Sequence, residues 1–147
     1  MSRALAVVLV AVAGLLVGMQ PPVNARLGRS IGSVQAATFS FLVGTVALSL
    51  VALIFYNGLG SFASVGKAPW WALVGGLLGA VYVTVAILTV RTLGVSGLTA
   101  IVIAGQLTAA VLIDRFGLLG IARHPIGAGR ILGLILLVAG ALLVVRR

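Results

Sequence analysis

Two amides near the start of the chain are the first side chains that could do chemistry. Gln20 and Asn24 stand four residues apart, so in a helix both amides fall on one face. An amide donates and accepts hydrogen bonds but does not titrate, so this pair can bind a polar solute without exchanging protons. The spacing therefore predicts a binding site.

Two adjacent prolines lie between these amides. Because proline has no N–H, Pro21 and Pro22 would free the carbonyls of Val17 and Gly18 from the helical hydrogen-bond pattern. In hydrocarbon, such carbonyls are tolerated only where protein or a water-filled cavity satisfies them. We expect a membrane helix that is broken beside a solute pathway, with the two prolines as its hinge.

Three further polar residues within apolar segments join the pair as candidate substrate-binding residues: Gln106, Ser40 and Tyr82. Each has a structural alternative, because a buried amide can hold two helices together and a tyrosine ring can pack between them. Asp114 is the only carboxylate of the chain, and an ionisable residue in a membrane segment is a candidate for proton coupling. Its neighbour Arg115 favours the alternative, a salt bridge at the membrane interface or with a second copy.

Catalytic and metal chemistry have almost no side chains to work with. The sequence contains one Asp or Glu, one His and no Cys, which leaves no nucleophile–base pair and no set of metal ligands. We therefore expect a protein that is not an enzyme and needs no metal or cofactor. His124, directly before Pro125, is expected in a solvated loop.

The composition indicates an integral membrane protein. Of its residues, 62% are hydrophobic and 7% are charged, and the mean hydropathy is +1.33, whereas roughly a quarter of a soluble domain is charged. The net charge of +9 comes from basic residues scattered at the ends of apolar segments. This pattern favours anchoring at anionic lipid headgroups over binding to nucleic acid.

The apolar stretches predict an all-α fold of five transmembrane helices in one domain, residues 1–147. Each is close to the ~20 residues that a span needs, and they lie near 4–24, 33–56, 69–90, 95–113 and 127–145. The first could be a cleaved signal peptide, but its apolar run exceeds the usual length of about 7–15 residues. Residues 57–66, rich in glycine and serine, are expected to form the one real loop.

Small residues spaced four apart predict where helices pack closely. Gly75 and Gly79 form one such face, and Gly129 and Gly133 form another.

The basic residues divide evenly between the two sides of a five-span topology. Five of the ten lie on each side, whereas an excess of Lys and Arg normally fixes orientation. The balance predicts insertion in both orientations, with accident as the alternative. Two opposed copies would then form an antiparallel homodimer of ten helices, similar to the inverted repeats of many transporters.

Several short motifs together resemble one family. They are Gly18-x-Gln20-x-x-x-Asn24, Ser40-Phe41-x-x-Gly44, Pro69-Trp70-Trp71 with Gly75-Gly76, Leu93-Gly94-Val95, Gly105-Gln106-Leu107 and the stretch from Asp114 to Gly117. The chain resembles the short, five-helix YdcZ-like branch of the drug/metabolite transporter superfamily. The resemblance implies a transporter of the bacterial inner (plasma) membrane.

The same resemblance exposes a departure. Small multidrug-resistance members of the superfamily couple export to protons through a glutamate on the first helix, where this chain offers Gln20 and contains no glutamate.

These observations favour a transporter that moves a small neutral or amphipathic organic solute by alternating access through a cavity on the dimer axis. Its expected partners are an oppositely oriented second copy, membrane lipids and the solute. The alternatives are a dual-topology ion channel and a membrane scaffold subunit without transport.

Overall fold

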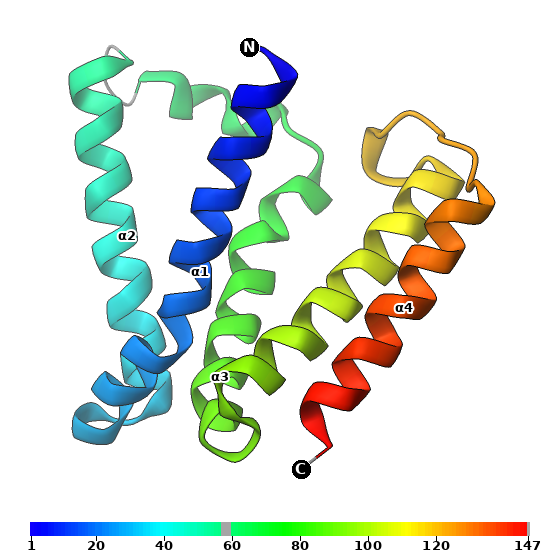
Figure 1. Ribbon diagram of the computed structural model, residues 1–147. Helices are drawn as coiled ribbons and strands as arrows, with labels where there is room; N and C mark the ends of the chain where they lie inside the picture. Colours follow the sequence, from blue (N-terminus) through cyan, green and yellow to red (C-terminus); the bar gives the residue numbers. More distant parts are fainter. Residues whose placement is uncertain (57–59, 147) are drawn as a thin grey trace. The chain divides into compact units, whose positions relative to one another are not determined.

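The computed structural model describes residues 1–56 and 60–146, and its regular elements there are all helical (Figure 1). In chain order they are α1 (Arg3–Ile31), α2 (Ser33–Phe55), η1 (Gly60–Lys67), η2 (Trp70–Val74), α3 (Gly75–Phe116), η3 (Leu118–Gly120) and α4 (Ala128–Val145). The chain forms two compact units, Met1–Thr89 and Val90–Arg147. We describe each unit by itself.

The expected all-α membrane fold is confirmed. Four helical stretches are long and apolar enough to cross a membrane. The third of them, Trp70–Phe116, contains 47 residues, far more than the ~20 that one crossing needs. Helical geometry within it stops at Gly94, where φ is 71° and ψ is 165°. The described chain therefore offers four or five membrane-capable helices, depending on whether this stretch crosses once or twice.

The expected break of the first helix is wrong. Helix α1 continues through Pro21 and Pro22 for 29 residues and ends at Ile31, not near residue 24. A proline removes only its own hydrogen bond, and the residues on both sides keep theirs in a membrane helix. The chain leaves the helix at Gly32, whose φ of 93° is open to glycine but strained for other residues.

The expectation of a single loop at residues 57–66 is also wrong for its later part. Gly60–Lys67 folds into the short helix η1, while residues 57–59 lie outside the described residues. The predicted third helix begins with the tighter turns of η2. The longest irregular described segment is instead residues 121–127, between η3 and α4.

The first unit is built on small residues at the joint of α1, α2 and the start of α3. Its buried cluster comprises Ala36, Ala37, Val83 and Ile87, with Leu27 and Tyr82 packed against it. A Cβ built on Gly28 would lie 3.1 Å from Ile87 Cγ2, so this glycine allows the helices to approach closely. Helices α1 and α2 pack against each other near their short connection and spread apart from it (Figure 1).

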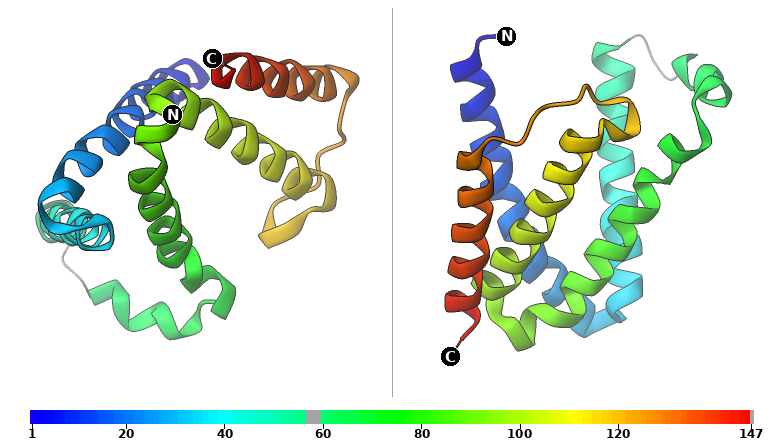
Figure 2. Two further views of the ribbon diagram at one scale, coloured as in Figure 1. Left: turned by 90° about the horizontal axis from the view of Figure 1, so that it is seen from below. Right: turned by 90° about the vertical axis from the view of Figure 1, so that its right-hand side faces the viewer.

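The second unit is a pair of antiparallel helices. Asp114 near the end of α3 contacts Arg130 near the start of α4. At the opposite end of the pair, a Cβ built on Gly97 would lie 3.6 Å from Val145 Cγ2. Both contacts agree with the course of α4 along the later part of α3 in Figure 2.

Candidate functional site

A hollow of about 250 Å³ lies between α1 and α2. It is lined by Gln20, Ser40, Phe41, Gly44, Thr45 and Leu48. Gln20 comes from α1 and the other five residues come from α2, where they recur at one-turn spacing and so share one face of the helix. The hollow combines an amide and two hydroxyls with apolar walls.

The amide of Asn24 contacts one of the residues that line the hollow, Ser40. Its Nδ2 donates a hydrogen bond to Ser40 Oγ across 3.3 Å, and Asn24 is only 6% exposed. Thr38, two residues earlier on α2, instead donates its hydroxyl to the carbonyl of Val34. The Ser40 hydroxyl is thus used between helices, and it bridges the buried Asn24 to the hollow that Gln20 lines.

The aromatic wall of the hollow rests on a glycine of α3. A Cβ built on Gly79 would lie 3.1 Å from Phe41 Cζ, which is tighter than ordinary van der Waals contact. Gly79 therefore gives the Phe41 ring room to lie against α3 while it lines the hollow.

The structure brings together only some of the predicted site residues. Gln20, Asn24 and Ser40 form one group, whereas Tyr82 packs against the buried cluster of the first unit. Of the two hinge candidates, Pro21 is buried and Pro22 is exposed. Gln106 belongs to the second unit, is exposed, and has no hydrogen-bond partner among the described residues.

The predicted packing glycines differ in their surroundings. Gly79 meets Phe41, but a Cβ built on Gly75, Gly129 or Gly133 would have no described atom within 4 Å. These three positions therefore do not pack closely within the chain, and they present open helix faces.

Asp114 forms an ion pair within its own chain. Its Oδ2 accepts a hydrogen bond from Arg130 Nη1 at 3.1 Å, and the Asp114 side chain is 31% exposed. The pair borders a groove of about 360 Å³, whose other lining residues are Leu107, Ala110, Val111, Gly133 and Leu137. The neighbouring position of Arg115 in the sequence suggested it as the partner of Asp114, but the partner is Arg130 of α4.

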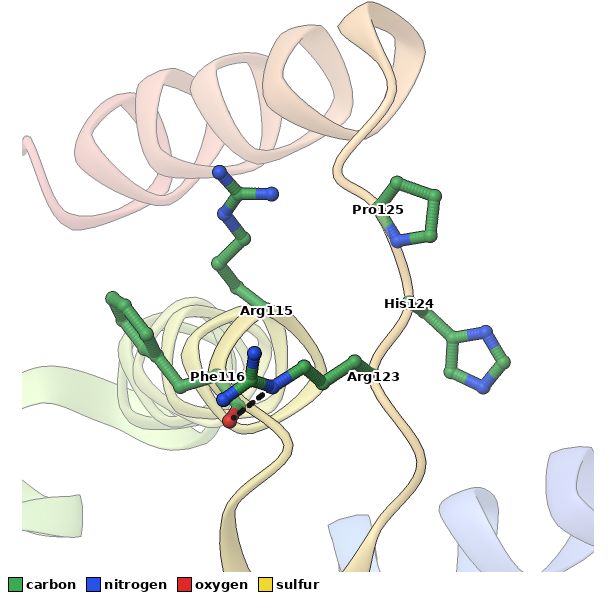
Figure 3. Close-up of a pocket in the computed structure, with 5 residues that line it drawn as sticks. All are labelled: Arg115, Phe116, Arg123, His124 and Pro125. Carbon is green, nitrogen blue, oxygen red and sulfur yellow. Dashed lines mark hydrogen bonds between the residues drawn. The ribbon is translucent and has the colours of Figure 1, made fainter.

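A third hollow, of about 420 Å³, lies where the chain leaves α3, and sequence reasoning missed it (Figure 3). It is lined by Arg115, Phe116, Arg123, His124 and Pro125. The composition already indicated arginines without an acidic partner, because the sequence contains ten basic residues and only one acidic residue.

Comparison with known proteins agrees with the membrane fold. Residues 5–143 match the family described as "Putative inner membrane exporter, YdcZ". The chain is 32% identical to the inner membrane protein YdcZ of Escherichia coli strain K12, over all of this chain and 99% of that protein. No solved structure matches the chain.

Proposed function

The chain belongs to the YdcZ family of inner membrane exporters, and from this membership we propose that it moves a small neutral or amphipathic organic solute across the membrane. The resemblance recognised from the sequence motifs is thereby confirmed, as is location in the inner membrane as a multi-pass protein. The description of the family supports a role in transport rather than in catalysis.

The observation that carries the choice of solute is the polar group between α1 and α2. The amide of Gln20 and the hydroxyl of Ser40 line a hollow with apolar walls, and the buried amide of Asn24 supports that hydroxyl. None of the described residues that line the hollow carries a charged side chain. Neutral donors and acceptors inside apolar walls suit a solute with a few polar groups and no net charge.

We propose that each chain crosses the membrane five times, with one crossing by the part of α3 before Gly94 and another by the part after it. We also propose that the chain pairs with a second copy in the opposite orientation. The exposed amide of Gln106 supports the second copy, because an amide left facing hydrocarbon is costly. The open faces at Gly75, Gly129 and Gly133 supply surfaces on which helices of another copy can pack. Alternating access would then expose the hollow to one side at a time.

Thiol labelling tests the proposed pathway, because the chain contains no cysteine and an introduced one is unique. Ser40→Cys places a thiol in the hollow, and Val43→Cys places one on the exposed side of the same helix as the matched control. We expect a membrane-impermeant methanethiosulfonate reagent to modify Ser40→Cys to completion from either side of the membrane alone. The control should stay unmodified.

The extent of labelling separates alternating access from a fixed site. If the protein inserts in both orientations but its hollow opens to one side only, labelling from one side stops near half. That plateau, or an unreactive Ser40→Cys, would contradict the proposal. Radiolabelled neutral amino acids, polyols and amphipathic dyes can then be screened for protection of this thiol.

Disulfide crosslinking tests the second copy. In an antiparallel dimer, a residue at the membrane midplane beside the two-fold axis faces its own counterpart. We expect Gln106→Cys to form crosslinked dimers under oxidation. Leu112→Cys, also exposed but nearer the end of α3, should not. Equal crosslinking at both positions would indicate random collision and overturn the proposed interface.

A further inference from the structure

We propose that the hollow at the end of α3, the Arg115–Arg123 hollow, binds the phosphate group of an anionic phospholipid. It is lined by Arg115, Phe116, Arg123, His124 and Pro125 and has a volume of about 420 Å³. The site belongs to the second unit and does not depend on the proposed solute pathway of the first.

The charge balance of the chain is the first argument. Asp114 is the only acidic side chain in the sequence, and it pairs with Arg130. No carboxylate side chain of the chain remains for Arg115 or Arg123, although both border one hollow. The two arginines are therefore available to an anionic ligand from outside the chain.

The second argument is that Arg123 is held in place. Its Nε donates a hydrogen bond to the carbonyl of Phe116 at 3.2 Å, which leaves the four N–H groups of its two terminal nitrogens for a ligand. Figure 3 shows the Arg123 side chain reaching back to the end of α3, while the ring of His124 points away from it. A fixed guanidinium fork suits the oxygens of a phosphate.

The loop that carries Arg123 is itself fastened to α3. The backbone N–H of His124 donates to the Asp114 carbonyl of α3 at 2.9 Å, and that of Ile121 closes the preceding turn by donating to the Leu118 carbonyl of η3 at 3.0 Å. At Gly117, φ is +65°, and a Cβ would lie 2.5 Å from Arg123 Cγ. The absence of a side chain at this glycine lets Arg123 lie against the helix end.

The position along the chain favours a lipid as the source of the phosphate. Arg115 lies in the last turn of an apolar membrane-capable helix and Arg123 in the loop after it, where basic residues meet the headgroups of anionic lipids. Phe116, which is 56% exposed, adds an apolar surface beside the two arginines for the start of an acyl chain. Inorganic phosphate has no apolar part that could contact the Phe116 ring.

Lipid retention by the purified full chain tests the proposal. Native mass spectrometry in neutral detergent would compare dioleoylphosphatidylglycerol with dioleoylphosphatidylcholine, which has the same acyl chains and no net charge. We expect wild type to retain the anionic lipid about tenfold better, because each arginine contributes to its attraction. Arg115→Gln combined with Arg123→Gln should remove most of this preference.

Arg3→Gln combined with Arg146→Gln is the matched control, because it removes the same charge from exposed sites outside the hollow. It should keep the preference, and an equal loss in both double variants would overturn the proposal. Arg115→Gln alone leaves every described hydrogen bond of the loop intact and should still lower retention, which separates binding from misfolding. A comparison with inorganic phosphate tests whether the ligand is a lipid or a free phosphate. If it stabilises wild type against thermal unfolding as strongly as the anionic lipid, the lipid assignment is wrong.

Discussion

Asn24 of α1, which is only 6% exposed, donates a hydrogen bond to the hydroxyl of Ser40 on α2 across 3.3 Å. The bond joins two helices that are otherwise held together by small residues. It also fixes the hydroxyl that lines the hollow beside Gln20. Stability and binding should therefore respond together when this pair is altered.

A double-mutant cycle measures the pair directly. We expect Asn24→Ala to lower the free energy of unfolding, and Asn24→Ala combined with Ser40→Ala to show a coupling of about 0.6 kcal/mol, the average for such bonds in membranes. Reversible unfolding in mixed micelles would supply the values. Strictly additive single changes would contradict the bond.

The contact between Gly79 and Phe41 predicts control of access to the hollow. An added methyl group at position 79 would lie 3.1 Å from Phe41 Cζ, so Gly79→Ala should displace the ring toward the hollow and slow labelling of Ser40→Cys. Phe41→Leu, added to the same chain, should restore the rate. Gly75→Ala, which meets no described atom within 4 Å, is the control that should leave labelling unchanged.

The prolines offer a test of the hinge, which stays a prediction. Pro22 is exposed within a continuous α1, so Pro22→Ala can restore the hydrogen bond to Gly18 without filling a buried space. We expect a rise in stability of up to about 3 kcal/mol together with slower two-sided labelling of Ser40→Cys. Unchanged labelling in the stabilised variant would remove the hinge role.

The ion pair at the end of α3 predicts a small effect on stability. Because Arg130 and Asp114 are 50% and 31% exposed, we expect Asp114→Asn to lower the free energy of unfolding by less than about 1 kcal/mol. Exchange of the two residues, Asp114→Arg with Arg130→Asp, should recover the loss. If Asp114 instead couples transport to protons, Asp114→Asn would abolish solute protection of Ser40→Cys while leaving stability nearly unchanged.

Substitution of Gly117 and of Gly120, both after α3, distinguishes the effect of backbone strain from the effect of contact with Arg123. Both have positive φ, but only at Gly117 would a Cβ collide with Arg123, whereas Gly120 faces open space. We expect about 1–3 kcal/mol of destabilisation from Gly120→Ala through strain alone, and more from Gly117→Ala. Only Gly117→Ala should also reduce retention of the anionic lipid.

The sequence was sufficient for the membrane fold because long apolar stretches have few alternatives to helices. It failed at Pro21–Pro22, where local rules predict a break and the helix continues. It failed again at residues 60–67, where a glycine- and serine-rich composition indicated a loop and the chain forms η1. In both places, the residue types alone disfavour the helix that the chain forms.

The site was predictable only where spacing along one helix determines it. The four-residue interval places Gln20 and Asn24 toward α2, as the periodicity indicates. The partnership of Asp114 with Arg130 depends on how two helices align, and that alignment is set by packing between residues far apart in sequence.

The connection between α1 and α2 consists of Gly32 alone, with hydrogen bonds on both sides of it. A joint of one residue cannot cross a bilayer, so the end of α1 and the start of α2 must emerge on the same side. During synthesis, the orientation taken by the first helix therefore commits the second to the opposite one. The two enter the membrane as a hairpin, and the direction of insertion is decided once for both.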